Sequence, residues 1–357
     1  MKKICIVFNH FQIQDGVARA AIGMANELIQ QKGVEVTLRP LFTCDREMQN
    51  RLDPGVKLEP FFGFYFRGFA RLVDLIPDSL LYRLVIRKNY DIEIGYCMSL
   101  PIKIIAASKR DCLHLAWMHG YDEGLTLIPS YKKVHKVICV SKSAAERFAK
   151  ETNHEIPVEY SYNLVDDETV IRMGSESITL PDTRDITFVC VGRHEPGKGY
   201  MNVVECIGKL KKNGYRVQAW LIGNGPQHAE LKNRAEQLGV TENVFFLGEQ
   251  RNPHAYTSKA DVFVCSSFSE GYSTACTEAI MLGVPVLTTD VGGAREIIED
   301  ANCGMVVGMR VDDLYDGMKH ILDHPELVSV WKKILEQSKY VFSKKERAAR
   351  LKNILDI

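Results

Sequence analysis

Short apolar runs alternate with stretches of helical periodicity along most of the chain. Residues 4–8 form the first pattern of a buried strand, and a short polar loop separates them from the stretch 16–31. In that stretch apolar side chains recur at helical spacing, at Val17, Ala20, Ala21, Met24 and Leu28. The pattern predicts a strand, a helix and then a second strand over residues 34–38.

The same alternation continues through both halves of the chain. In the first half it predicts further buried strands over 90–96, 112–119 and 136–141, and a helix over 143–150. In the second half it predicts strands over 185–193, 215–223, 243–248, 260–267 and 284–289, with helices over 201–212, 229–238 and 274–283. Strands that alternate with helices indicate parallel sheets covered by helices on both faces.

The predicted fold class is therefore α/β, with two doubly wound Rossmann-like domains facing across a cleft. The first domain is expected over residues 1–165 and the second over 166–340, with the polar stretch 166–184 as a linker. Residues 341–357 are predicted to form a C-terminal helix that could pack back on the first domain. In such sheets ligands bind at the carboxyl ends of the strands.

Composition narrows the classes of function. The 357 residues are 46% hydrophobic and 25% charged, with equal numbers of basic and acidic residues, which is ordinary globular composition. A nucleic-acid-binding protein is normally basic, so nucleic acid is not predicted as a partner. The first half is slightly basic and the second slightly acidic, which could favour an anionic surface or be ordinary charge scatter.

Cysteine and histidine patterns predict no metal site and no cofactor. The ten cysteines contain no Cys-x-x-Cys pair, and the ten histidines contain no His-Glu-x-x-His motif. Reduced, buried thiols fit a cytoplasmic protein best. No run of apolar residues is long enough for a membrane span, so at most a peripheral contact with the inner face of the cell membrane is expected.

The most informative segment is 266–293, where a strand leads through a glycine-containing loop into a helix. Glu270 lies in the loop, Gly271 allows the backbone to turn, and Glu278 lies within the helix that starts near Ser273 and Thr274. Free backbone amides and the helix dipole at such a helix start can bind a phosphate group. The two carboxylates could accept hydrogen bonds from sugar and ribose hydroxyls, or they could be solvated surface charges.

Two other loops carry possible phosphate-binding signals. Arg193 and Lys198 follow the first strand of the second domain, where a guanidinium and an ammonium group would suit a diphosphate. Both could equally be solvated cations of a surface loop. The segment 223–226, Gly-Asn-Gly-Pro, lacks the third glycine of a dinucleotide fingerprint, which favours a tight turn with Pro226 at the start of a helix.

These motifs together resemble the family-4 retaining glycosyltransferases of the GT-B architecture, of the bacterial surface-polysaccharide type. The paired glutamates, the basic loop, the Gly-Asn-Gly-Pro turn, the strand 260–267 and the segment 283–293 match that family in order and spacing. The resemblance implies that Arg193 and Lys198 neutralise the donor diphosphate. It also implies that Glu278 accepts from the ribose and Glu270 from the donor sugar.

Other roles follow from the same resemblance. The amides of Gly271, Tyr272, Ser273 and Thr274 would contact sugar and phosphate. In the first domain Gly16 would approach the diphosphate, with Arg19 following at the family's spacing. His119, after a strand, would contact the sugar near the reacting carbon, or it could be a buried structural histidine.

The sequence departs from the family at three positions. Asp15 stands before Gly16 where the family often has a second glycine, which places a carboxylate near the predicted phosphates. Tyr272 and Ser273 stand where phenylalanine and glycine are frequent, which could alter the sugar preference.

The implied function is retaining transfer of a sugar, from a nucleotide-diphosphate donor such as a UDP-sugar to a glycan or lipid-linked acceptor, without a metal ion. A same-face substitution is favoured over double displacement, because no acid is evident for the opposite ring face. The alternatives are a nucleotide-sugar epimerase of the same architecture and a non-enzymatic nucleotide-sugar binder. An NAD dehydrogenase is disfavoured because no full glycine fingerprint follows the first strand.

Residues 59–88 raise the question of membrane contact. They mix aromatic residues with five cations, at Arg67, Arg71, Arg83, Arg87 and Lys88. This composition could place the segment at a membrane interface, near a lipid-linked acceptor. Alternatively, residues 61–69 and 80–86 could pack into the core of the first domain.

Overall fold

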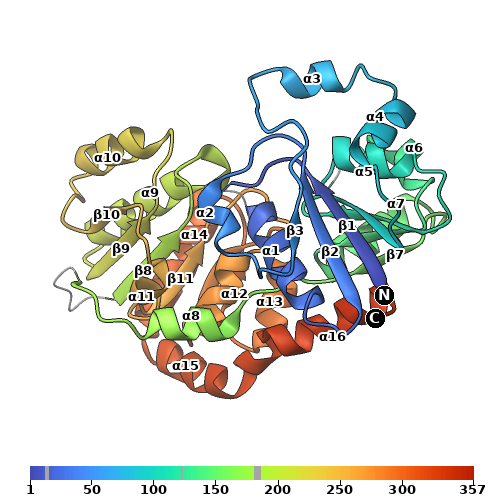
Figure 1. Cartoon of the computed structure of the whole chain (residues 1–357). Helices are drawn as coiled ribbons and strands as arrows, with labels where there is room; N and C mark the ends of the chain where they lie inside the picture. The colour runs from blue at the N-terminus through green and yellow to red at the C-terminus, as the bar shows by residue number, and fades with distance from the viewer. Residues whose placement is uncertain (13–15, 122–123, 181–185) are drawn as a thin grey trace. The chain divides into compact units, whose positions relative to one another are not determined.

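The computed structural model describes residues 1–12, 16–121, 124–180 and 186–357 (Figure 1). The chain divides into two compact units, each built on its own sheet. Unit 1 comprises Met1–Leu164 and Arg347–Ile357, and unit 2 comprises Val165–Glu346.

The sheet of unit 1 has seven strands in the order β3-β2-β1-β4-β5-β6-β7, and every pairing is parallel. Its strands are β1 (Lys2–Phe8), β2 (Val34–Pro40), β3 (Lys57–Leu58), β4 (Ile92–Tyr96), β5 (Leu113–Met118), β6 (Lys136–Cys139) and β7 (Val158–Tyr160). The order reverses between β1 and β4, so this pair of strands is the switch point of the sheet.

Helices connect these strands. They are α1 (Gly16–Leu28), α2 (Arg46–Gln49), α3 (Phe69–Val73), α4 (Asp78–Val85), α5 (Leu100–Ala106), α6 (Ile128–Tyr131) and α7 (Lys142–Glu151). The C-terminal helix α16 (Lys344–Leu355) contributes its residues from Arg347 onward to unit 1. Lys352 of α16 pairs with Glu27 of α1 at 2.9 Å, and the two chain ends lie next to each other in Figure 1.

The sheet of unit 2 has six strands in the order β10-β9-β8-β11-β12-β13, again all parallel. Its strands are β8 (Ile186–Val191), β9 (Val217–Ile222), β10 (Val244–Gly248), β11 (Val262–Cys265), β12 (Val286–Thr289) and β13 (Met305–Val307). This is the Rossmann strand order, with its switch point between β8 and β11.

The helices of unit 2 are α8 (Asp167–Gly174), η1 (Pro196–Lys198), α9 (Tyr200–Lys212), α10 (His228–Gln237), α11 (Pro253–Thr257), α12 (Thr274–Met281), α13 (Ala294–Ala301), α14 (Val311–Asp323), α15 (Glu326–Ser338) and η2 (Lys339–Phe342). The central strands are buried on both faces: β9 is buried throughout, and its Val217, Ala219 and Leu221 belong to the core. The prediction of two parallel α/β domains is therefore confirmed.

The stretch predicted as a linker, 166–184, is not wholly extended, because it contains helix α8. Asp166 caps this helix by accepting a hydrogen bond from the Thr169 amide at 3.2 Å, and Asp167 and Glu168 follow in the first turn. At its other end, Gly174 packs on Leu282, so closely that a Cβ there would lie 2.2 Å from the Leu282 side chain. The acidic residues that resembled a linker are thus a helix start.

The segment 59–88 divides between the core and the surface of unit 1. Leu81, Tyr82, Val85 and Ile86 are buried in a core cluster, and Phe61, Phe62 and Phe69 pack against it. Other apolar side chains of the segment are exposed: Phe64, Tyr65, Phe66, Leu72, Leu75, Leu80 and Leu84. Among the described residues no helix combines the length and the apolar character needed to cross a bilayer.

Candidate active site

The switch point of unit 2 brings two predicted loops together. The loop after β8 carries Arg193 and Lys198, and the loop after β11 carries Glu270. Because β8 and β11 pair in parallel, their carboxyl ends lie at the same edge of the sheet. Residues 72 positions apart in the chain, Lys198 and Glu270, therefore come into direct contact.

Close backbone packing holds these two loops against each other. Gly199 has a φ of +65°, and a Cβ there would lie 2.0 Å from the carbonyl oxygen of Ser266. The Ser266 hydroxyl donates to the Lys198 carbonyl at 2.8 Å, and the Phe268 amide donates to the Gly197 carbonyl at 2.9 Å. Only glycine at position 199 permits this approach, which fixes the backbone on which Lys198 stands.

Lys198 and Glu270 form a half-buried ion pair. The Nζ atom of Lys198 lies 2.7 Å from Oε1 of Glu270, and the Ser267 hydroxyl donates to the same oxygen at 2.7 Å. Burial lowers the pKa of Lys198, but the Glu270 carboxylate outweighs it and raises that pKa above its usual value. Lys198 therefore stays charged beside the Glu270 carboxylate.

Arg193 has a different environment from Lys198. Its guanidinium is exposed and forms an ion pair with Glu195, at 3.6 Å between Nη1 and Oε2. The structure thus places both predicted cations in one loop but pairs only Lys198 with Glu270. The long Arg193 side chain is held by one exposed contact, which costs little to break.

The loop carrying Glu270 continues into the N-terminus of α12. Ser273 is the N-cap, and its hydroxyl accepts from the Cys276 amide at 3.3 Å. One of the four amides expected to be free is therefore already used. Gly271 and Thr274 are partly exposed on either side of the cap, whereas Tyr272 is buried.

Gly292 and Gly293, which follow β12, pack against the loop that carries Glu270. A Cβ at Gly292 would lie 2.3 Å from the Glu270 carbonyl oxygen, and one at Gly293 would lie 2.6 Å from the Tyr272 ring. The segment after β12 therefore presses its backbone on residues 270–272. This packing gives Gly292 and Gly293 a physical role, which is to fix the backbone of the Glu270 loop.

Glu278 lies one turn into α12, partly buried. Its Oε2 atom is 3.9 Å from Nδ1 of His254, which belongs to α11. His254 was missed by sequence reasoning because it lies 24 positions away in a helix that the periodicity does not predict. The two predicted acids, Glu270 and Glu278, flank the start of the same helix but have separate partners.

The Gly-Asn-Gly-Pro turn packs on the Arg193 loop. A Cβ at Gly223 would lie 2.0 Å from the Gly192 carbonyl oxygen, and one at Gly225 would lie 2.5 Å from that of His194. The glycines thus serve close backbone contact, as expected for a tight strand-to-helix turn. Helix α10 begins at His228, so the prediction that Pro226 starts the helix is wrong by two residues, which form a turn before it.

A histidine pair next to Arg193 was also missed. The Nδ1 atoms of His194 and His228 lie 2.9 Å apart, and their rings stack at 5.1 Å between centroids. Burial, together with His228, lowers the pKa of His194 to about 4, so the pair is neutral near pH 7. The position of His194, directly after Arg193, was the signal available in the sequence.

In unit 1, Gly16 is the first residue of α1, after β1. Gly16 is exposed, and a Cβ there would meet no atom of the described residues within 4 Å. Packing against those residues therefore does not require glycine at this position. Asp15, which was predicted to place a carboxylate near phosphates, lies outside the described residues.

His119 follows β5 at the carboxyl edge of the same sheet. Its ring packs edge-on against Tyr96 of β4 at 4.3 Å between centroids. Burial lowers the pKa of His119 to about 3, so the imidazole is neutral at physiological pH. Its Nε2 atom is buried and has no hydrogen-bond partner among the described residues. A buried polar nitrogen without such a partner is unusual, because most buried side-chain polar atoms form a hydrogen bond.

Comparisons with known proteins find similarity to glycosyltransferases. Residues 175–337 match the family model described as glycosyl transferases group 1. The lipopolysaccharide core biosynthesis glycosyltransferase LpsD of Rhizobium meliloti is 21% identical over 89% of this chain and 88% of its own length.

Two further proteins extend the comparison. The N-acetylgalactosamine-N,N'-diacetylbacillosaminyl-diphospho-undecaprenol 4-alpha-N-acetylgalactosaminyltransferase of Campylobacter jejuni is 28% identical over 49% of this chain; the chain spans about half, 47%, of that relative. The crystal structure of Anabaena HepE in complex with UDP superposes with a TM-score of 0.77 at 15% identity, covering 100% of both chains.

These findings establish the class. The two parallel α/β units have the fold of GT-B glycosyltransferases. Residues 175–337, which carry Arg193, Lys198, Glu270 and Glu278, match the model of the group 1 glycosyltransferases. The resemblance to bacterial polysaccharide glycosyltransferases of the GT-B architecture is thereby confirmed, whereas the retaining mechanism and the roles of the site residues stay predictions.

Proposed function

We propose that the chain is a retaining glycosyltransferase that moves a sugar from a nucleotide-diphosphate donor, a UDP-sugar, to a glycan or lipid-linked saccharide in surface-polysaccharide synthesis. The observation that carries this proposal is the contact between Lys198 and Glu270 beside the start of α12. The relatives support the rest: one is named for lipopolysaccharide core synthesis, one acts on a diphospho-undecaprenol-linked saccharide, and HepE binds UDP.

In this proposal the diphosphate of the donor binds between cations and backbone amides. Lys198 is charged and held by Glu270, so it can reach a phosphate oxygen with little reorganisation. Arg193, on an exposed contact, can turn toward the same group and bind it in bidentate fashion. The amides around Gly271 and Thr274 add donors at the positive end of the helix dipole.

The two glutamates would bind the two hydroxyl-bearing ends of the donor. Oε1 of Glu270 already accepts two hydrogen bonds, which leaves Oε2 as an acceptor for hydroxyls of the sugar. Glu278, next to His254, would accept from the ribose. Gly271, Tyr272, Ser273 and Thr274 remain proposed donor contacts, and so do Gly16 and His119 in unit 1.

Sugar transfer would then proceed on one face of the ring. The acceptor hydroxyl oxygen forms a bond to the anomeric carbon while the bond to the diphosphate oxygen breaks, and the departing diphosphate takes the hydroxyl proton. Negative charge grows on the diphosphate, where Lys198 and Arg193 stabilise it without a metal ion. The new bond forms on the face that the leaving group vacates, so the anomeric configuration is retained.

We also propose that the exposed face of α3 and α4 contacts an anionic membrane. Leu72 is 55% exposed and Leu75 is 80% exposed. Arg67, Arg71, Arg83 and Arg87 are exposed in the same segment. Apolar side chains flanked by cations suit the interface of a bilayer that contains acidic lipid, where a lipid-linked acceptor would reside.

The experiment is to incubate the full chain with UDP-, GDP- and ADP-sugars, with and without an undecaprenyl-diphosphate-linked saccharide. The proposal expects transfer from a UDP-sugar, undiminished by a chelator, and nuclear magnetic resonance spectra that show the donor's anomeric configuration in the product. An epimer formed from donor alone would establish an epimerase instead. Tight binding without any turnover would establish a nucleotide-sugar binder.

A further inference from the structure

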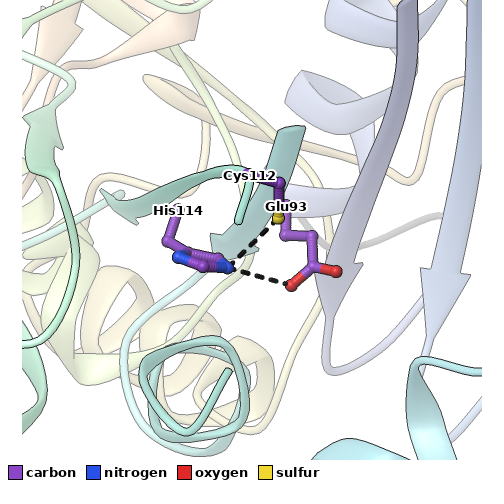
Figure 2. Close-up of side chains that lie close together, drawn as sticks. All are labelled: Glu93, Cys112 and His114. Carbon is purple, nitrogen blue, oxygen red and sulfur yellow. Dashed lines mark hydrogen bonds and ion pairs between the residues drawn. The ribbon is translucent and has the colours of Figure 1, made fainter. Parts of the chain in front are cut away.

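Three side chains with metal-binding atoms converge near the amino-terminal ends of β4 and β5 in the sheet of unit 1. Glu93 of β4 and His114 of β5 are direct partners in the parallel pairing of these strands. Cys112 precedes His114 by two positions, so strand geometry sends both side chains to the face that also carries Glu93. Figure 2 shows the three side chains pointing toward one another.

Their donor atoms meet around one nitrogen. The Sγ atom of Cys112 lies 3.2 Å from Nε2 of His114, and the same Nε2 lies 3.4 Å from Oε2 of Glu93. A proton relay of the Cys-His-Glu kind would use opposite nitrogens of the imidazole ring. Here one nitrogen, one sulfur and one oxygen all lie within 4.8 Å of one another, which is the arrangement around a common centre.

We infer that Glu93, Cys112 and His114 form a binding site for a thiophilic divalent cation, best matched by Zn²⁺. Sulfur, imidazole nitrogen and carboxylate oxygen are the donors that Zn²⁺ takes in proteins, and three protein ligands leave one position of a tetrahedral site open. Glu93 is fully buried and His114 is 5% exposed, so two of the three donors are already withdrawn from water.

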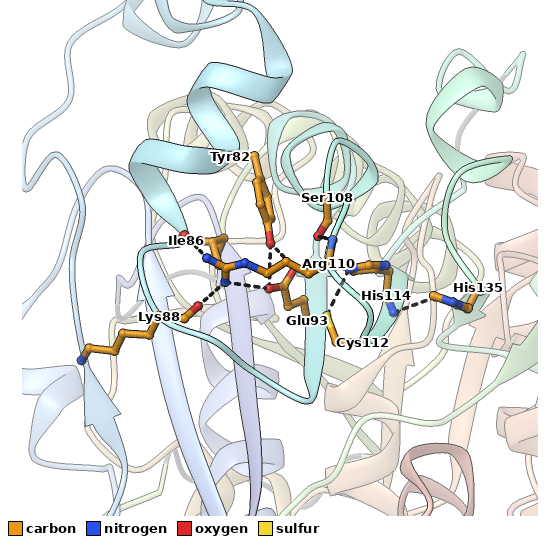
Figure 3. Close-up of polar contacts among 9 residues, drawn as sticks. All are labelled: Tyr82, Ile86, Lys88, Glu93, Ser108, Arg110, Cys112, His114 and His135. Carbon is orange, nitrogen blue, oxygen red and sulfur yellow. Dashed lines mark hydrogen bonds and ion pairs between the residues drawn. The ribbon is translucent and has the colours of Figure 1, made fainter.

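The surroundings hold the Glu93 carboxylate in position through hydrogen bonds to both of its oxygens. The Tyr82 hydroxyl lies 2.9 Å from Oε1 and 3.0 Å from Oε2 of Glu93 and donates one shared hydrogen bond. Nη1 of Arg110 approaches Oε1 at 3.5 Å, and its Nη2 donates to the Ile86 carbonyl at 3.2 Å (Figure 3). Such outer hydrogen bonds orient the carboxylate of a metal site.

Charge in the site changes when the ion binds. Without metal, the Arg110 cation offsets the Glu93 carboxylate, and Cys112 is a free cysteine whose thiol carries a proton. Binding of Zn²⁺ forms a zinc–sulfur bond and releases that proton to solvent. Affinity should therefore fall as the pH is lowered, because protons compete for the same ligands.

This cluster is separate from the proposed active site. Cys112 directly precedes β5 and His114 is its second residue, whereas His119 follows its end. The sequence did not reveal the cluster, because the third ligand comes from another strand and Cys112-x-His114 matches no recurrent zinc motif. Metal binding at this cluster does not depend on whether the protein transfers a sugar.

The test uses the full chain, treated with chelator, kept reduced and titrated with Co²⁺ and then Zn²⁺. One equivalent of Co²⁺ should give the intense absorption of a sulfur-to-cobalt bond, and Zn²⁺ should displace it. Cys112→Ser should abolish that absorption, whereas the matched variant Cys44→Ser, which alters another half-buried thiol, should retain it. Tyr82→Phe should weaken affinity about 10-fold or more by freeing the carboxylate.

A second measurement does not depend on a folded variant. In the wild-type chain, Zn²⁺ should protect Cys112 from alkylation by iodoacetamide, read residue by residue by mass spectrometry, and leave Cys44 unprotected. Absence of a sulfur-to-cobalt band in the wild type, or equal alkylation of Cys112 with and without Zn²⁺, would overturn the inference.

Discussion

The ammonium group of Lys198 lies 2.7 Å from the carboxylate of Glu270, which joins the loop after β8 to the loop after β11. The contact spans the switch point of the unit 2 sheet, the place where α/β folds bind ligands. The Glu270 carboxylate thus holds a charged lysine beside the start of α12. The proposed sugar transfer depends on this cation.

Lys198→Ala should lower kcat by about 100-fold or more while the fold stays intact, because a donor to the developing negative charge is lost. Steady-state kinetics with saturating donor measure this directly. Lys212→Ala, which removes an exposed lysine at the end of α9, is the matched control and should retain full activity. Near-normal turnover in Lys198→Ala would remove Lys198 from the mechanism.

Glu278→Gln should act mainly on binding. If Glu278 holds the ribose equally in the ground state and the transition state, the variant should raise KM for the donor by about 10-fold or more and change kcat little. Glu236→Gln on the exposed surface of α10 serves as the control. A fall in kcat at unchanged KM would instead place Glu278 at the reacting sugar.

Substitution of alanine for Gly16 should weaken donor binding, whereas the same substitution at Gly292 should lower stability. Gly16→Ala should leave the free energy of unfolding within about 0.5 kcal/mol, since a Cβ meets nothing there, but it should weaken donor binding. Gly292→Ala should destabilise unit 2 by about 1–3 kcal/mol, because its Cβ would lie 2.3 Å from the Glu270 carbonyl oxygen. Denaturant unfolding and donor titration measure both effects; unchanged donor affinity in Gly16→Ala would argue against a diphosphate contact.

His119 should make stability depend on pH. Its folded-state pKa, about 3, lies below the value of about 6.5 for a free histidine, so between these values the unfolded chain binds a proton that the folded chain does not. Stability from this group is complete above about pH 6.5 and is lost progressively as the pH falls toward 3. Unfolding of wild type and His119→Gln at pH 7 and pH 5 should show a smaller loss in the variant; equal losses would contradict the neutral, buried imidazole.

The exposed face of α3 and α4 should bind acidic vesicles. Wild-type protein should float with vesicles that contain phosphatidylglycerol and less so with neutral ones, and added salt should weaken binding. The double variant Leu72→Asp and Leu75→Asp should stay in solution, whereas Val330→Asp, at an exposed apolar position of unit 2, should float like the wild type. Failure of the wild type to float with either vesicle would refute the membrane contact.

Periodicity was sufficient to predict the fold class because buried parallel strands are short apolar runs separated by amphipathic helices. It failed for α8, where an acidic N-cap and first turn have the composition of a linker. Periodicity also could not decide whether residues 59–88 are buried or exposed, because Leu81 and Val85 lie in the core whereas Leu72 and Leu75 lie on the surface. A one-dimensional pattern does not show which face meets the sheet.

For the candidate site, the sequence predicted the loops that carry Lys198 and Glu270 but not the contact between them. It could place Lys198 and Glu270 at strand ends, yet their pairing depends on strand order, which local sequence does not encode. The contact of His254 with Glu278 arises in the same way. The roles of Arg193, Gly16 and His119 toward a donor stay predictions.

The most direct measurement is calorimetric titration of UDP into the wild-type chain and into the double variant Arg193→Ala and Lys198→Ala, with Lys212→Ala as the control. The account predicts one equivalent of UDP bound by the wild type and the control, and a loss of affinity of at least about 100-fold in the double variant. Equal binding of UDP by all three proteins, or binding by none of them, would contradict it.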